Sequence, residues 1–336
     1  MRFLLTDEQR DFARALDGLL GACATPAAVR AWAAGDHGPG RALWSRAATA
    51  GVFGLAVPEK HGGTGLLPVE LAVACTEWGR HAAPGPLAET VAAAALLERL
   101  GSDVVAGEWL PRIAAGEAVV SLCAPSGTAE WPDDGDPFAL DGDAADAVFV
   151  VRGDTLLLAD GHGPVQPSLD PARRLSRPLG GTTLARGPAV AAAAAHAAEV
   201  ARLATAAQSL GLGRALLTAT VGHVTRRTQF GVAIGSFQAV KHRLADTLIG
   251  LEFAQPLVHA AALALADGAP SAGREIAAAK VAAGEAGYAA ARTALQLHGA
   301  LGYTDEPDLS LWIRKARPLR DAWGTPADCR ARVLDD

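Results

Sequence analysis

Most of the chain carries apolar residues at helical spacing, and one region has a different period. Residues 1 to about 118 are typical of helices separated by glycine- and proline-rich loops. From about 119 to 190 the apolar runs shorten to strand length, as in "VVSLCAP", "AVFVVRG" and "DTLLLAD". From about 191 the helical pattern returns. The pattern predicts a mainly α chain with an N-terminal helical domain (1–118), a small middle β domain (119–190) and a C-terminal antiparallel helical bundle (191–336).

Two predicted helices of the third region show how the bundle would pack. One apolar stripe recurs every three or four residues along a helix, at Val240, Leu244, Leu248 and Leu251. The next predicted helix, about 271 to 298, is mostly Ala and Gly, so its neighbours can approach it closely. Both observations favour long helices packed side by side.

Composition narrows the class of protein. The net charge is −6 and the pI is about 5.9, so there is no basic excess that would favour nucleic acid as a partner. The N-terminus has acidic residues and a helix start at Thr6, unlike a signal peptide, and no uncharged apolar run reaches the length of a membrane span. The four cysteines are scattered and the nine histidines lack metal-ligand spacing. We therefore expect a cytoplasmic protein with reduced thiols, no metal and no membrane partner.

Two interruptions of the helical pattern are candidates for chemistry. They are "RTQFGVAIGSFQAVKHRLAD" (227–246) and "QLHGALGYTDEPDLSLWIRKAR" (296–317). Each has an ordinary explanation as a helix end closed by glycine, with Pro307 preventing continuation in the second. Each also has a functional explanation, since glycine-rich turns let backbone amides approach an anionic ligand. Neither the GxGxxG fingerprint nor a P-loop is present.

Several motifs in order resemble one family. These are "LTDEQRDFARAL", "LWSRAATAGVFGLAVPEKHGGTG", "TEWGRHAAPGPLAET", "WLPRIAAGE", "RRTQFGVAIGSFQAVKHRLAD" and "ALQLHGALGY". Together they resemble the acyl-CoA dehydrogenase family of flavoproteins. The resemblance implies an N-terminal helical domain, a middle β domain, a C-terminal helical bundle and FAD as cofactor.

The same resemblance assigns cofactor contacts to the two interruptions. In the family, the Arg-x-x-Phe-Gly loop of one subunit reaches the FAD bound mainly by its neighbour. This implies that Arg227 pairs with the FAD pyrophosphate, for which its guanidinium fork is suited. Phe230 would pack near the adenine end, and Gln238 would hydrogen-bond the dinucleotide. The remaining implied contacts, near the pyrophosphate, are Gln296, Gly299 and Ala300, the last in place of a family glycine.

The middle domain departs from the family pattern. Family members carry a Thr-Glu-Pro…Gly-Ser-Asp segment and a Lys-x-x-Ile-Thr segment that cover the flavin ring. Here the corresponding stretches are "SLCAPSGTAEWPDDGDPFAL" and "AVFVVRGDTLLLAD", which contain neither motif. We therefore expect a reduced β domain that does not cover a flavin ring by itself.

The catalytic base is the second departure. Dehydrogenation removes an α-proton from the acyl-CoA, and a carboxylate must lie within hydrogen-bond reach of that carbon. Trp323 stands where many members have Glu, and Ala201 stands where others have it. An indole N–H only donates. The nearby carboxylates are Glu199, which the register turns away, and Asp321, for which a solvated loop is the simpler explanation.

These features favour one hypothesis over two others. They resemble the short subunit of heteromeric actinobacterial acyl-CoA dehydrogenases that act on steroid side chains. The chain would then work with a second, Glu-bearing subunit as a heterotetramer, on an acyl-CoA thioester, and pass electrons to an acceptor flavoprotein. The alternatives are a homo-oligomeric acyl-CoA dehydrogenase using Glu199 or Asp321, and a scaffold paralogue that binds no flavin.

Overall fold

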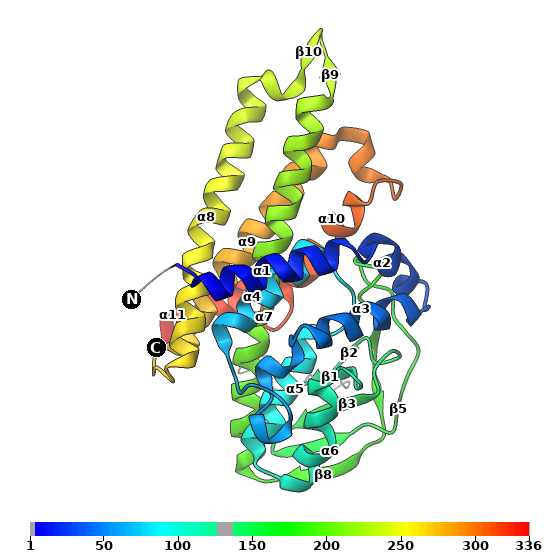
Figure 1. The fold of residues 1–336 in the computed structure, drawn as a ribbon, viewed down its shortest axis with the longest axis vertical. Coiled ribbons are helices and arrows are strands. Elements are labelled where there is room, and N and C mark those ends of the chain that lie inside the picture. The colour runs from blue at the N-terminus through cyan, green and yellow to red at the C-terminus, as the bar shows by residue number, and fades with distance from the viewer. Residues whose placement is uncertain (1–3, 126–136, 336) are drawn as a thin grey trace.

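The computed structural model describes residues 4–125 and 137–335, and its long axis follows one helix that runs through the whole molecule (Figure 1). Short helices and a small sheet surround the lower part of this helix, and a bundle of long helices continues above them. The order of helices, sheet and helical bundle is the one that the sequence predicts.

The N-terminal region is helical. Its helices are α1 (Asp7–Gly21), α2 (Thr25–Ala33), α3 (Gly38–Thr49), α4 (Pro68–Arg80), α5 (Leu87–Leu100) and α6 (Asp103–Ala114), with the 3-10 turns η1 (Phe53–Ala56) and η2 (Glu59–His61). The predicted cap at Thr6 is confirmed, because its hydroxyl accepts from the Gln9 amide while the Gln9 side chain accepts from the Thr6 amide. α5 is apolar nearly all round and is therefore buried along most of its length.

The middle region contains a mixed sheet of four strands. In sheet order these are β1 (Val120–Cys123), β3 (Ala147–Arg152), β4 (Thr155–Leu158) and β8 (Thr182–Arg186). β1 pairs parallel with β3, and the other neighbours are antiparallel. Two minor pairs are β2 (Ala139–Leu140) with β6 (Leu175–Ser176) and β5 (Gly161–His162) with β7 (Pro178–Leu179). Part of the stretch at 121–140 that departs from the family motif, residues 126–136, lies outside the described residues.

The C-terminal region is a helical bundle. Its elements are α7 (Pro188–Arg226), β9 (Thr228–Gln229), β10 (Val232–Ala233), η3 (Ile234–Ser236), α8 (Gln238–Ala266), α9 (Ala272–His298), η4 (Gly299–Tyr303), α10 (Leu309–Asp321) and α11 (Pro326–Asp335). Close approach of the helices depends on glycine, as predicted from the Ala- and Gly-rich composition. A Cβ at Gly287 of α9 would lie 2.6 Å from the Ser209 carbonyl oxygen of α7.

The apolar stripe predicted for α8 is only partly buried. Leu251 is fully buried, but Leu248 is 44% exposed and Phe253 is 73% exposed. Within the described ranges, α8 is also the one helix whose length and apolar composition would let it cross a membrane, which is weak evidence for a span. The exposed apolar residues instead form a face of the kind that protein partners cover.

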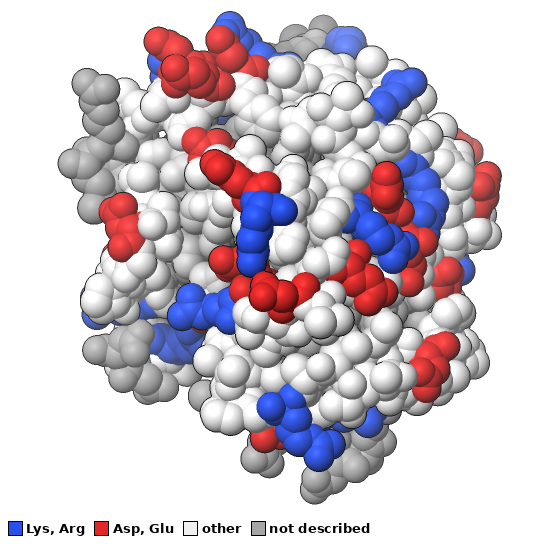
Figure 2. Space-filling model, turned by 60° about the horizontal axis from the view of Figure 1, so that its bottom comes forward, with Lys and Arg blue, Asp and Glu red and all other residues white. Residues whose placement is uncertain are grey.

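Charges are mixed on the surface at the lower end of the molecule. On the face shown in Figure 2, basic and acidic side chains alternate and large uncharged areas separate them. That face offers no single-sign patch of the kind that binds a nucleic acid backbone.

Candidate functional site

The two interruptions in the helical pattern lie at the same end of the bundle. Arg227 follows the last residue of α7, Gln238 begins α8, and Gln296 belongs to the last turn of α9. Residues 227–238, which we call the arm, include the β9–β10 hairpin that projects from the upper tip of the molecule (Figure 1). The structure therefore brings the predicted cofactor contacts of both interruptions to one end.

The tip of the arm presents an aromatic side chain to solvent. Phe230 is 91% exposed and has a positive φ of 55°, unusual for a bulky residue, and Gly231 follows with φ 80°. Its ring meets Phe237 edge to face, with the centroids 6.3 Å apart. A tip that buries no side chain in its own chain is suited to contact another molecule.

A stacked pair of histidines joins the two interruptions. The rings of His223 on α7 and His298 on α9 are 4.0 Å apart between centroids, and His298 Nδ1 donates to the Ala294 carbonyl oxygen. Burial lowers the pKa of His223, and His298 and the Arg227 and Arg226 guanidinium groups lower it further. The stack holds the base of the arm beside the turn that follows α9.

This end of the bundle has the groups that bind phosphate. Arg227 is exposed and forms no ion pair within the part of the chain that the structure describes. The first turn of α8 has no side-chain cap, and it forms the positive end of a long helix. Gly299 has φ 59° and open space where a Cβ would be, so its backbone is accessible, and Ala300 follows it in η4. These are groups of the kind that bind phosphate in proteins.

The second candidate region lies in the turn between α10 and α11. Trp323 has φ 59°, and its indole Nε1 donates to Glu89 Oε1 at 2.9 Å. Its carbonyl oxygen accepts from Arg202 Nε at 3.1 Å. Glu89, in the first turn of α5, is 4% exposed. We call Trp323, Glu89, Arg202 and the cavity described below the closed site.

The two candidate carboxylates for a displaced base are engaged elsewhere. Ala201 is fully buried in α7, while Glu199 pairs with Arg202 at 2.7 Å and with Arg332. Asp321, at the end of α10, lies 3.2 Å from Arg320, and its side chain is 38% exposed. Neither carboxylate lines the cavity beside Glu89.

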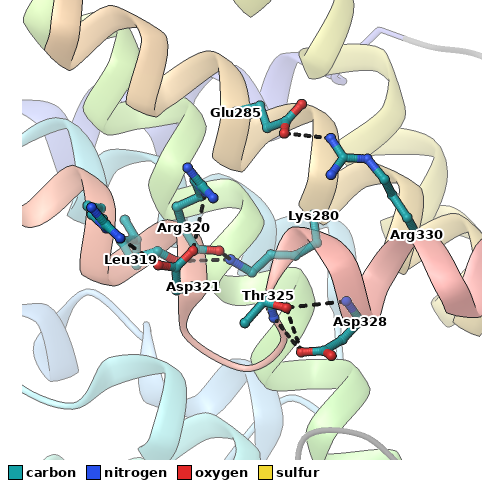
Figure 3. A network of polar contacts seen from close by, with 9 residues as sticks. Lys280, Glu285, Leu319, Arg320, Asp321, Thr325, Asp328 and Arg330 are labelled. Carbon is teal, nitrogen blue, oxygen red and sulfur yellow. Dashed lines mark hydrogen bonds and ion pairs between the residues drawn. The ribbon is translucent and has the colours of Figure 1, made fainter.

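A buried lysine fixes the turn that carries Trp323. Lys280 on α9 is 2% exposed and donates to the carbonyl oxygens of Leu319 at 2.9 Å and Arg320 at 2.7 Å (Figure 3). Burial lowers its pKa to about 7. On the other side of the turn, Thr325 and Asp328 cap each other at the start of α11. The turn is therefore held from both ends.

The cavity of the closed site is small and polar. Its volume is about 30 Å³, and its lining includes Glu89, Asp141, Asp170 and Lys315. Lys315 pairs with the buried Asp170 at 2.8 Å, and burial raises the pKa of Asp141 to about 7. Pockets for cofactors or substrates usually have volumes of about 300–1,000 Å³, so this cavity has room for a water molecule and not for a flavin ring or an acyl chain.

Sequence reasoning missed the polar groups of this region. Glu89 has the pattern of an ordinary acidic residue in the first turn of a helix, and Lys280 sits in an alanine-rich stretch without any signal. A further cluster, Asp17, Glu77 and His81, has the composition of a metal site. Its groups already have protein partners, because His81 contacts Asp17 at 2.8 Å and Arg80 donates to Glu77 at 2.7 Å.

Comparisons with known proteins match most of the chain. The family description "Acyl-CoA dehydrogenase, N-terminal domain" matches residues 6–117, and "Acyl-CoA dehydrogenase, C-terminal domain" matches residues 191–331. Acyl-CoA dehydrogenase IpdE2 of Mycobacterium tuberculosis is 32% identical over 333 residues, which cover 97% of this chain and 96% of that protein. IpdE2 of Mycolicibacterium smegmatis is 31% identical and covers 92% of each.

Solved structures have the same fold. The Tcur3481–Tcur3483 steroid ACAD superposes with a TM-score of 0.84 at 26% identity, covering 98% of this chain and 97% of the other. The ChsE4–ChsE5 complex from Mycobacterium tuberculosis superposes with a TM-score of 0.83 at 24% identity, covering 100% and 98%. The second likeness bears on the fold alone.

Proposed function

Because this chain belongs to the acyl-CoA dehydrogenase family of FAD-dependent oxidoreductases, we propose that it is the partner-dependent subunit of a heteromeric acyl-CoA dehydrogenase. Its arm would contact an FAD bound mainly by a second, Glu-bearing subunit. We place its domain boundaries near 118 and 190 and its location in the cytoplasm. The observation that carries the proposal is the closed site, where Trp323 donates to a buried Glu89 beside a cavity too small for substrate.

The reaction explains why the closed site matters. The reaction takes the α-proton of the thioester to a carboxylate base, and bound FAD supplies the acceptor for the β-hydride. A Trp cannot take that proton, and a buried Ala201 leaves no side chain to do so. Glu199 and Asp321 are held in ion pairs, which disfavours the homomeric alternative.

The arm end supports the FAD assignment. Arg227 can pair with phosphate oxygens, and the uncapped amides at the start of α8 and the accessible backbone at Gly299 and Ala300 can donate to them. Phe230 can pack on an adenine, and Gln296 lies at the same end of the bundle. An unpaired arginine beside a helix N-terminus disfavours the scaffold alternative, which has no use for either.

The substrate proposal rests on relatives. The Tcur3481–Tcur3483 protein is described as a steroid ACAD, is 26% identical over nearly the whole chain, and is named for two components. We propose a steroid side-chain CoA thioester as substrate, a heterotetramer as the assembly, and a flavoprotein as electron acceptor.

One experiment separates the three hypotheses. The chain is purified alone and with its candidate Glu-bearing partner, both are supplied with FAD, and acyl-CoA is mixed anaerobically while flavin absorbance is followed. We expect bleaching by the complex and none by the isolated chain, since a missing acid or base lowers rates by about 10²–10⁴-fold. Bleaching by the isolated chain would make Glu199 or Asp321 the base. A complex that carries no flavin would favour the scaffold.

A further inference from the structure

A hollow lies where α1 crosses the direction of the long helices α7 and α8 (Figure 1). Its volume is about 400 Å³, and its walls come from α1, α4, α7 and α8, together with Leu4 and Leu5 before α1. Pockets for small molecules usually have volumes of about 300–1,000 Å³, so this space is large enough for a ligand. We call it the α1/α4 hollow.

The α1/α4 hollow is separate from the closed site. Among the described residues, none lines both this hollow and the cavity of the closed site. Gln208 of α7 lines the cavity of the closed site, and Thr76 of α4 lines the hollow. The two helices touch between these residues, because a Cβ at Gly79 would lie 2.0 Å from the Gln208 carbonyl oxygen. The hollow is therefore a different space from the one where the dehydrogenation site would lie.

Buried apolar side chains form one wall of the α1/α4 hollow. Val69, Ala72 and Val73 follow one another at helical spacing on the face of α4 that lines it. Leu210 of α7 and Val258 of α8 continue this wall. All five are at most 7% exposed, so the wall is fixed by the core behind it. Such a wall binds an apolar ligand by removing the ligand's surface from water.

The charges in the lining are mainly positive. Arg10, Arg80 and Arg214 line the hollow, and Glu77 is the one carboxylate among the described lining residues. Arg80 donates to Glu77 through Nε at 2.7 Å and Nη2 at 3.4 Å, so this carboxylate already has its counterion. Arg214 uses Nη2 for both of its partners on α8, and its Nε and Nη1 form no hydrogen bond within residues 4–125 and 137–335. The exposed acidic partners of Arg10 and Arg214 do not line the hollow, which leaves an excess of guanidinium groups around it.

We propose that the α1/α4 hollow binds a medium-chain aliphatic carboxylate, an inference that does not rest on the proposed function. The aliphatic chain packs on the apolar wall, and the carboxylate accepts hydrogen bonds from the donors of Arg214 that have no partner. Arg214 lies one turn beyond Leu210 on the same face of α7, so the charged and apolar parts of the lining adjoin. The guanidinium groups disfavour a cationic ligand, and the apolar wall has no use in binding an inorganic anion.

The test is isothermal titration calorimetry of the full-length chain with decanoate. We expect saturable binding, which Arg214→Gln should weaken about tenfold, because hydrogen bonds to charged groups are the stronger class. The matched control is Arg14→Gln, which removes one positive charge from an exposed residue of α1 that does not line the hollow. Decanol has the same chain length and no charge, so it should also bind about tenfold more weakly than decanoate.

A second pair of variants tests the location. Ala13→Phe fills the hollow with a ring from α1 and should abolish decanoate binding. Ala15→Phe adds the same ring at an exposed position of α1 that does not line the hollow, and it should leave binding unchanged.

Three results would overturn the proposal. They are the absence of saturable decanoate binding to the parent chain, equal affinities of Arg214→Gln and Arg14→Gln, and full binding by Ala13→Phe. Decanol that binds as tightly as decanoate would likewise overturn it, since the guanidinium groups would then have no part in recognition. These titrations contain no flavin and no acyl-CoA, so their failure leaves the proposed function untouched, and bleaching by the isolated chain would leave the hollow untouched.

Discussion

Two turns in this molecule share a backbone geometry and differ in every other respect. Phe230 and Trp323 are aromatic residues at positive φ, of 55° and 59°, and each precedes a glycine that also has positive φ. Phe230 points into solvent at the tip of the arm, whereas Trp323 hydrogen-bonds to the buried carboxylate of Glu89. The same kind of turn therefore exposes a side chain at one place and seals a site at the other, and the difference lies in what surrounds it.

The largest effect is expected at the closed site. Trp323→Ala removes most of a packed indole and leaves Glu89 without its donor, so we expect a loss of about 3–5 kcal/mol in the free energy of unfolding. Urea denaturation measures it. Trp323→Phe is the matched variant, since it keeps an aromatic ring and removes the donor. A Trp323→Ala variant as stable as the parent protein would show that the turn is not sealed by this contact.

At the arm, by contrast with the closed site, we expect a substitution to change flavin binding and to leave stability nearly unchanged. Arg227→Ala removes one charge-assisted contact, so flavin binding by the assembled complex should weaken by about 1.5–3 kcal/mol, with little change in the stability of the chain. Flavin absorbance of the purified complex measures this. Arg226→Ala, which changes the neighbouring exposed residue, is the control. Equal flavin loss in both variants would contradict a specific role for Arg227.

The buried lysine, Lys280, should make the stability of the protein depend on pH. The pKa of Lys280 falls to about 7 on folding from an ordinary value of 10.5. Between these values the unfolded chain binds more protons than the native protein, so this group makes stability rise with pH across that window. Lys280→Met should lose about 1–3 kcal/mol, because two carbonyl oxygens lose their donor, and should also lose this rise. Denaturation curves across the window measure both; a variant with an unaltered pH profile would exclude Lys280 as the source.

The smallest effect is expected at the stacked histidines. The pKa of His223 is lowered from its ordinary value of 6.5, so the neutral form is favoured in the native protein. Stability from this group is complete above 6.5 and declines as the pH falls below that value, since the unfolded chain then binds more protons. His223→Phe keeps a ring for stacking with His298 and should flatten this decline by less than about 1 kcal/mol. Thermal unfolding at mildly acidic pH would detect it, and an unchanged acid decline would point to other groups.

The sequence predicts much of the fold and little of the closed site. The cap at Thr6 and the helix ending at His298 follow from local chemistry, because capping residues and glycine act within a turn. The parallel pairing of β1 with β3 depends on distant segments, and no local signal encodes it. Glu89 contacts Trp323 across 234 positions of the chain, so the sequence around either residue gives no sign of the contact. The exposure of Leu248 shows a further limit, since periodicity marks an apolar face without saying what covers it.

The glycine contacts of α7 have a mechanical consequence. A Cβ at Gly211 would lie 1.8 Å from the Thr76 carbonyl oxygen of α4, and Gly287 makes a similar approach to Ser209 from α9. The helix is therefore closely packed on two sides at one level, about 25 Å below the arm and just above the buried residues around Arg202. A side chain larger than hydrogen at Gly211 or Gly287 would force apart the helices that hold the middle of α7, and α7 is the element that carries Arg202 and leads into the arm.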